Sequence, residues 1–244
     1  MSTQAILKEV ISFCALNNVE IIKIIAEEDG TKVQSHDAEK TLFIEGSFGT
    51  VPEFVGEFGI SNLKMLSGLI NFSQGDGASS FKANLRTVDG SEVLDQFEFK
   101  GRGAKSVFKL MDAAHIPEQA KIASIPWGFE LTDLSKDRFS EFQTFAGLYS
   151  EVDKQFGITV VDGELIFSFG QEASSTHSGS ISYGKVDGTL KNPLLFPVDK
   201  FAMLMKLALS REKSKLMFTD KGLLGVEIEA DYGLYRYYLR QSVR

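Results

Sequence analysis

The sequence of 244 residues has little cysteine, little histidine and no excess of basic charge. Its one cysteine, Cys14, excludes an intrachain disulfide and any metal site built from several thiolates. Lys and Arg number 26 against 33 Asp and Glu, so the net charge is −7 and the chain is not a generally basic nucleic-acid-binding domain. No run of about 18 apolar residues exists, so we expect no membrane-spanning helix.

The motifs of common enzyme chemistries are also missing. His36, His115 and His177 do not have the spacing of metal ligands. No phosphate-binding loop or dinucleotide fingerprint is present. The stretch Ser180–Gly184 approaches a serine nucleophile elbow but lacks its first glycine, and it is more typical of an edge strand. We expect Cys14 to be a core thiol. The sequence therefore predicts no catalytic residues, no metal and no cofactor.

The hydrophobic content of 43% is ordinary for a globular protein, and the length allows one large domain or two small ones. The first residues, MSTQAILKEVISF, lack the charged segment and cleavage site of a signal peptide. We therefore expect a soluble intracellular protein.

Apolar residues at helical spacing predict four helices, each with one buried face. Alternating and β-branched runs between turn residues predict strands. The expected helices are Thr3–Asn17, Ile60–Phe72, Ser135–Val152 and Val198–Ser210, and the expected strands are 19–26, 31–35, 41–47, 81–88, 92–100, 104–111, 127–131, 158–161, 164–169, 179–186, 215–219, 223–229 and 234–239.

The same order of elements occurs twice. The hairpin glycines Gly30 and Gly163 lie 133 residues apart, and the starts of the second helix in each half, Ile60 and Val198, lie 138 apart. A nearly constant offset indicates an internal duplication. We expect an α+β fold with mostly antiparallel strands, in which residues 1–111 and 127–244 form two similar domains and residues 112–126 form a linker.

The outward faces of the four helices have an unusual composition. Twelve positions form these faces, and they include four lysines and no acid, where the overall composition would give about 1.6 acids. Such faces suit a surface that approaches a polyanion without reading its sequence. Four ordinary solvated faces explain the pattern equally well. The positions are Lys8, Ser12, Ala15, Ser61, Lys64, Gly68, Ser140, Thr144, Gly147, Lys206, Ser210 and Lys213.

Three stretches resemble the proliferating cell nuclear antigen family, the DNA sliding clamps. Residues 230–239, ADYGLYRYYL, are similar to the A-D-x-G-x-x-K-Y-Y-L ending of that family. The segment Lys109-Leu110-Met111-Asp112, followed by Ile116-Pro117-Glu118-Gln119, resembles the last strand of the first clamp domain and its linker. Ile6-Leu7-Lys8-Glu9-Val10 resembles the start of the first helix. The length and short loops also resemble the clamps of large tailed bacteriophages.

The resemblance implies a head-to-tail homotrimeric ring with helices inside and sheets outside. Such a ring encircles double-stranded DNA and tethers DNA polymerase as a processivity factor, and a clamp loader places it on DNA. It implies that six basic residues face DNA: Lys8, Lys64, Lys136, Lys206, Arg211 and Lys213. One departure is Lys8-Glu9, since family clamps often carry adjacent basic residues there. The chain would act at replicating DNA, in host cytoplasm if viral or in a nucleus if eukaryotic.

The resemblance also implies a pocket for partner peptides and a subunit interface. By position, the pocket residues are His36, Lys40, Thr41, Ile116, Leu223, Tyr238 and Leu239. The interface residues lie on one strand from each domain and are Ser106, Phe108, Lys109, Leu110, Ser180, Ile181, Ser182 and Tyr183. Pairing two such edge strands between subunits would cover both.

Two other classes of function stay open at this stage. An enzyme built on a duplicated α+β scaffold would need a cleft with perturbed titrating groups, and the sequence shows no such cluster. A structural assembly protein, for example of a virion, would share the duplication without binding DNA. Binding of DNA that depends on salt would separate the clamp from the assembly protein.

Overall fold

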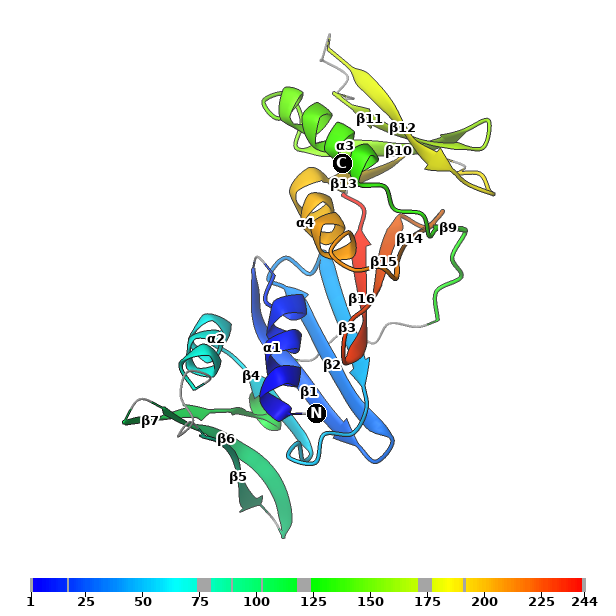
Figure 1. Cartoon of the computed structure of the whole chain (residues 1–244). Coiled ribbons are helices and arrows are strands. Elements are labelled where there is room, and N and C mark those ends of the chain that lie inside the picture. The colour runs from blue at the N-terminus through cyan, green and yellow to red at the C-terminus, as the bar shows by residue number, and fades with distance from the viewer. Residues whose placement is uncertain are drawn as a thin grey trace. The chain divides into compact units, whose positions relative to one another are not determined.

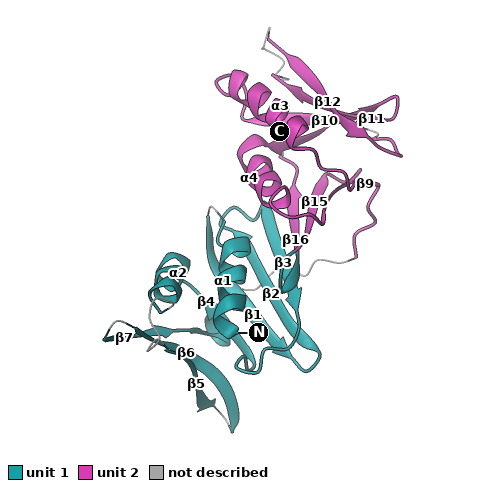
Figure 2. Ribbon diagram, in the orientation of Figure 1, with its two compact units in different colours: residues 1–120, 230–235 teal, residues 121–229, 236–244 magenta. Residues whose placement is uncertain are grey.

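The computed structural model describes residues 2–16, 18–73, 80–88, 90–101, 103–117, 124–170, 177–190 and 192–242. The chain forms two compact units (Figure 2): residues 1–120 with 230–235, and residues 121–229 with 236–244. A division at the linker alone, at 1–111 and 127–244, leaves residues 230–235 in the second domain. The structure assigns them to the first unit because the last strand begins in one unit and ends in the other.

The first unit (Figure 1) contains two helices and two antiparallel groups of strands. Strands β8-β4-β1-β2-β3 lie in this order in one group, and β5-β6-β7 form the other. The elements are α1 (Thr3–Cys14), β1 (Val19–Glu27), β2 (Gly30–Asp37), β3 (Leu42–Phe48), β4 (Glu57–Ile60), α2 (Leu63–Phe72), β5 (Ser80–Val88), β6 (Ser91–Gly101), β7 (Ala104–Lys109), β8 (Met111–Asp112) and the short 3-10 helix η1 (Ala113–His115).

The second unit repeats this content. Strands β12-β11-β10-β13 form a four-stranded sheet, and β15-β14-β9 are neighbours in that order. The elements are β9 (Phe129–Leu131), α3 (Lys136–Leu148), β10 (Gln155–Val161), β11 (Glu164–Phe169), β12 (Gly179–Lys185), β13 (Leu194–Pro197), α4 (Val198–Ala208), β14 (Ser214–Thr219), β15 (Leu223–Glu229) and β16 (Gly233–Arg240).

The topology confirms both the duplication and the α+β class. The first half runs helix, four strands, helix and then further strands, and the second half repeats this order after the short strand β9. In the first unit the four strands pair in the order β4-β1-β2-β3, and in the second the equivalent strands pair as β13-β10-β11-β12. The two units therefore share one connectivity as well as one element order.

Helical periodicity predicted the buried faces well. Ile6, Leu7, Val10, Phe13 and Cys14 of α1 are all buried. In the second unit, Phe142 of α3 packs against four aromatic rings of the core, from β10, β11 and α4, with ring centroids 4.9 to 5.9 Å apart. Aromatic pairs add about 0.5–1.5 kcal/mol each to the burial of apolar area, so these rings hold α3 on its sheet.

The start of the second helix was predicted wrongly. Residues up to Ile60 belong to β4, and α2 begins only at Leu63. A four-residue apolar strand directly before an apolar helix cannot be separated from it by periodicity. Asn62, with a φ of 50°, makes the turn between the two. The equivalent strand β13, before α4, was missed for the same reason.

The ends of α1 and α3 also differ from expectation. The helix α1 ends at Cys14, and α3 ends at Leu148, earlier than Asn17 and Val152. The predicted linker 112–126 contains the end of β8 and the 3-10 helix η1 before residues outside the described ranges, which include Glu118 and Gln119. Across the residues that the structure describes, none of the helices combines the length and apolar character that crossing a membrane requires.

Candidate functional site

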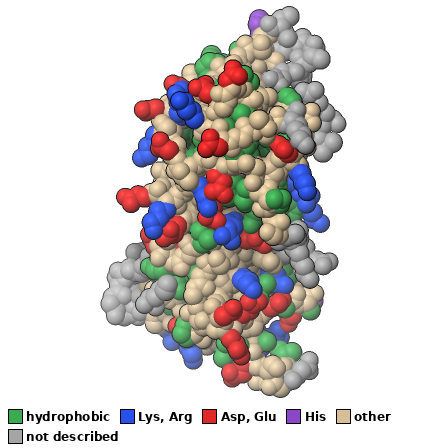
Figure 3. All heavy atoms as spheres, turned by 90° about the vertical axis from the view of Figure 1, so that its right-hand side faces the viewer, with side chains coloured by type: hydrophobic (Ala, Val, Ile, Leu, Met, Phe, Trp, Pro, Cys, Tyr) green, Lys and Arg blue, Asp and Glu red, His purple; other side chains and the backbone are tan. Residues whose placement is uncertain are grey.

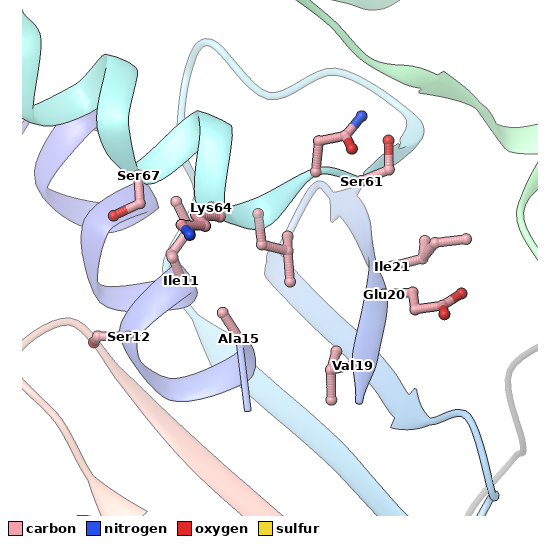
Figure 4. A pocket seen from close by; sticks show the side chains of 11 residues that line it. Ile11, Ser12, Ala15, Val19, Glu20, Ile21, Ser61, Lys64 and Ser67 are labelled. Atoms are coloured by element: carbon pink, nitrogen blue, oxygen red, sulfur yellow. The ribbon is translucent and has the colours of Figure 1, made fainter. Parts of the chain in front are cut away.

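The exposed faces of α1 and α2 border one hollow of the first unit. Lys8, Ser12 and Ala15 are exposed on and just after α1, and Lys64 is exposed on α2. A hollow of about 820 Å³ lies between α1, α2 and the start of β1, lined by Ser12, Ala15, Ser61, Lys64, the exposed acid Glu20 and six further residues. Figure 4 shows these side chains around it. The first unit thus brings together the two helix faces that composition singled out.

The second residue of the Lys8-Glu9 pair does not lie on this face. Glu9 is only 6% exposed, and its two carboxylate oxygens accept from the backbone N–H of Tyr232 at 3.1 and 3.3 Å. Burial raises the pKa of Glu9 above its ordinary value, and backbone hydrogen bonds from Tyr232 and Asp231 offset part of that rise. Because Glu9 is buried, Lys8 is the only exposed charged side chain of α1, as Lys64 is of α2. The departure from the family pattern therefore adds no exposed acid to this face.

In the second unit, three of the four predicted basic residues have acidic neighbours. Lys136 and the half-buried Arg211 line a hollow of about 390 Å³ together with Asp133 and Glu212. Lys213 pairs with Glu229 at 3.0 Å, whereas Lys206 is exposed in the last turn of α4.

The exposed surface of α3 also carries acids beside its polar face. Asp137 and Glu141 are exposed, and Glu141 pairs with Arg138 at 3.2 Å. The faces of this unit are consequently more mixed in charge than those of α1 and α2.

The two strands predicted to form the subunit interface are both edge strands. Strand β7 is the last strand of the β5-β6-β7 sheet, and β12 is the first of the β12-β11-β10-β13 sheet. On β7, Phe108 is buried while Lys109 is exposed and donates to Asp95 at 2.6 Å. On β12, Ile181 and Tyr183 are buried while Ser180 is exposed.

The predicted interface residues also include Ser106, Leu110 and Ser182, which are half-buried. Each edge strand therefore buries one set of side chains in its own unit, and among the described strands it pairs along one backbone edge only.

The residues of the predicted partner pocket are divided between the units. His36, Lys40, Thr41 and Ile116 belong to the first unit, and Leu223, Tyr238 and Leu239 belong to the second. The pocket as a whole stays a prediction.

In the first unit, the predicted pocket residues lie at the end of β2, in the structured turn that follows it, and directly after η1. Thr41 donates to the Asp37 carboxylate from both its backbone and its hydroxyl at 2.8 Å, which orders the turn that presents the exposed Lys40. His36 contacts the Phe43 ring. Ile116 packs against Gly59 of β4.

Within the second unit, one residue beside the predicted pocket was missed. The indole of Trp127 stacks on the Tyr238 ring, with centroids 6.3 Å apart and planes 10° apart. Leu239 is fully buried and Leu223 is half-buried. The signal that could have indicated Trp127 is that the single tryptophan of the chain directly follows the predicted linker.

The candidates for catalysis have no catalytic surroundings. Cys14 is buried, which confirms a core thiol, and burial raises the pKa of the thiol far above its ordinary value. Ser180 and Ser182 lie on the edge strand β12 and not at a turn from a strand into a helix, as a nucleophile elbow requires. Within the described ranges, no three His, Cys, Asp or Glu side chains gather closely enough to hold a metal ion.

Charges on the strands are largely paired with one another. Glu227 pairs with Lys215 at 3.1 Å and with Arg236 at 2.6 Å, and Glu98 pairs with Lys105 at 2.7 Å. On the face that Figure 3 shows, basic and acidic side chains are interspersed and do not gather by sign. Such a surface offers no extended attraction to a polyanion.

Two units of this kind in one chain, each with two helices and antiparallel sheets, define the fold of the DNA sliding clamps. Among solved structures, the chain is similar to proliferating cellular nuclear antigen from Entamoeba histolytica, with 17% identity over 98% of this chain and 96% of that one and a TM-score of 0.65. The match confirms the fold that the three motifs predicted, and it gives no support to the resemblance to phage clamps. No protein-family model and no curated protein matches the sequence.

Proposed function

We propose that this chain is the subunit of a sliding clamp, a ring that encircles duplex DNA without reading its sequence and tethers DNA polymerase to its template. It acts as a scaffold and performs no chemistry of its own. The observation that carries the proposal is the clamp fold combined with two helices, α1 and α2, whose only exposed charged side chains are Lys8 and Lys64.

The physical basis of the activity is topological. An enzyme bound to a ring around DNA stays at a high effective concentration near its template, because leaving requires the ring to open or the bound enzyme to dissociate. The ring must also slide, so its contacts with phosphates have to be few and individually weak. Isolated lysines among Ser, Gly and Ala meet that need. The acidic remainder of the chain disfavours adsorption of DNA elsewhere.

The finer parts of the proposal concern partners and assembly. The ring is a head-to-tail homotrimer in which β7 of one subunit pairs with β12 of the next, and a clamp loader closes it on DNA. DNA polymerase binds through a short segment with apolar and aromatic anchors, at the pocket that includes Tyr238. The residues facing DNA are Lys8, Lys64, Lys136, Lys206, Arg211 and Lys213.

Charge reversal on the α1 and α2 faces tests the contact with DNA. Each phosphate contact that is lost lowers the slope of log K against log salt by about 1. In the proposed homotrimer Lys8→Glu/Lys64→Glu changes six lysines, two in each subunit, so we expect the slope to fall by up to about 6. Binding of a short labelled duplex should weaken as well, measured by fluorescence anisotropy across a salt series.

A matched control is Lys82→Glu/Lys221→Glu, which changes the net charge equally at two exposed lysines outside the helices. It should leave the slope unchanged. If both double variants behave alike, the helix faces do not contact phosphates, and an assembly protein becomes the better explanation of the fold.

A further inference from the structure

The face of β15 that points away from α4 lies under a single indole. Leu224, Val226 and Ile228 are fully buried on the face that packs against α4. Gly225 lies on the opposite face, and its cross-strand partner on β14 is Met217. Although Met217 lies on the face that points away from α4, its side chain is only 3% exposed.

On this face Trp127 lies against Gly225. A Cβ atom at Gly225 would collide with the Cη2 atom of Trp127 and lie 2.9 Å from its Cζ2 atom, so the indole fits only because residue 225 is glycine. The hydrogen bond from Gln241 N to Gly222 O, at 2.8 Å, sets a register in which Tyr238 of β16 lies opposite Gly225. The Gly225 backbone and the Tyr238 ring together form a flat surface, which we call the seat, and the indole stacks on it.

The indole is held in this seat by stacking and shape. It is half-buried, and among the described residues the structure gives its N–H no hydrogen-bond partner. Residues 124–128 lie outside helices and strands, and the backbone N–H of Gly128 donates to Phe218 O at 2.7 Å. The backbone beside Trp127 is therefore anchored, while its side chain can leave by rotation about its own bonds.

We propose that Trp127 occupies, in the free chain, the seat that a planar aromatic side chain of a partner peptide takes on binding. This rests on the proposed partner pocket at Tyr238. The present occupant is itself a flat aromatic ring that stacks on Tyr238, which is the chemistry that a second aromatic ring would reproduce. Trp127 thus competes with the peptide for this surface. A peptide without an aromatic anchor binds weakly, because it displaces the indole without replacing the stacking on Tyr238.

The test uses a synthetic fluorescein-labelled peptide with one leucine and two adjacent phenylalanines between lysines, the lysines chosen to complement the net charge of −7. We expect Trp127→Ala to bind it about tenfold more tightly than the wild type, since no indole has to leave. Trp127→Phe keeps a ring on the seat and should bind like the wild type. Because Trp127 is the only tryptophan, its emission in the wild type should move to longer wavelength as the peptide binds.

The outcomes separate this proposal from the one on which it rests. Equal affinity of wild type and Trp127→Ala, with unchanged tryptophan emission, overturns the displacement and leaves the pocket standing. Absence of binding in every variant overturns the pocket itself and the displacement with it.

Gly225→Ala gives a measurement that needs neither the peptide nor the alanine variant at position 127. Its Cβ should push the indole off the seat and shift the emission to longer wavelength. An emission spectrum equal to that of the wild type overturns the described seat.

Discussion

Glu9 has a carboxylate at the junction between α1 and the segment 230–235, which belongs to the same unit. Both of its oxygens accept from the Tyr232 backbone, and the neighbouring Phe13 of α1 stacks on Tyr235 with ring centroids 4.6 Å apart. The final segment of the chain is therefore held on α1 by a polar contact and an aromatic one. Desolvation of the carboxylate opposes the polar contact.

The pH dependence of stability should report this balance. The pKa of Glu9 is raised in the folded chain, so the stability linked to its protonation is present at low pH and is lost as the pH rises through the folded pKa. Glu9→Gln keeps an oxygen acceptor and never ionises. We expect the melting temperature of the variant, relative to wild type, to increase between about pH 4 and about pH 7, measured by thermal unfolding followed by circular dichroism.

Glu9→Ala serves as the contrasting variant. It leaves the Tyr232 N–H without its acceptor and should lose about 1–3 kcal/mol of unfolding free energy. If the melting temperature of Glu9→Gln, relative to that of the wild type, falls as the pH rises, burial is not the dominant effect on the pKa of Glu9.

Sequence reasoning reached part of this residue-level picture. The helical period places Lys8 outward and Val10 inward, but Glu9 lies near the boundary between faces, and its burial depends on Tyr232, more than 200 residues away. Trp127 was missed for the same kind of reason. Its contact with Gly225 depends on how β14 pairs with both β9 and β15, and no local pattern contains those registers.

Among the elements, the long amphipathic helices were predictable because one buried stripe at a period of 3.6 residues determines each of them. Short strands next to a helix, β4 and β13, were not, since four apolar residues fit either period. The predicted outward positions of Lys8, Lys64 and Lys206 follow from the helix period, but α4 ends at Ala208, so Ser210 and Lys213 do not lie on a helix face as predicted. The predicted partner pocket draws on residues of both units and so depends on tertiary structure.

Strand β7 gives an element-scale prediction about assembly. Leu110 N donates to Asp95 O at 3.0 Å, so by alternation the N–H of Val107 points to the free edge of the sheet and not to β6. Proline is tolerated on an edge strand in such a position but donates no hydrogen bond. We expect Val107→Pro to fold normally and to weaken self-association at least about tenfold, measured by sedimentation.

Val107→Thr is its matched control, because it keeps both the β-branched shape and the backbone donor. It should self-associate like the wild type. Loss of association in both variants would mean that the apolar side chain of Val107, 39% exposed in this chain, holds the subunits together and not the pairing of strand backbones.

At the scale of the whole molecule, the two edge strands lie in different units, β7 in the first and β12 in the second. A dimer with twofold symmetry would pair β7 with β7 or β12 with β12 of the second subunit. Pairing β7 with β12 is heterologous instead, and it makes either a closed ring or an open filament. Closure is what the tethering function needs, since only a closed ring holds DNA topologically. The proposed function therefore requires an assembly that is finite and has one size.

The native mass tests this directly. Three copies of the 27.0 kDa chain give a ring of about 81 kDa. We expect light scattering to approach that mass as concentration rises and to fall toward the monomer on dilution, because mass action governs an interface of only two strands. The mass should level off at the ring and not continue to rise, and Val107→Pro should shift the whole curve to higher concentration. A chain that stays monomeric at tens of micromolar, or one whose mass grows without limit, has no closed ring, and the tethering mechanism then fails with it.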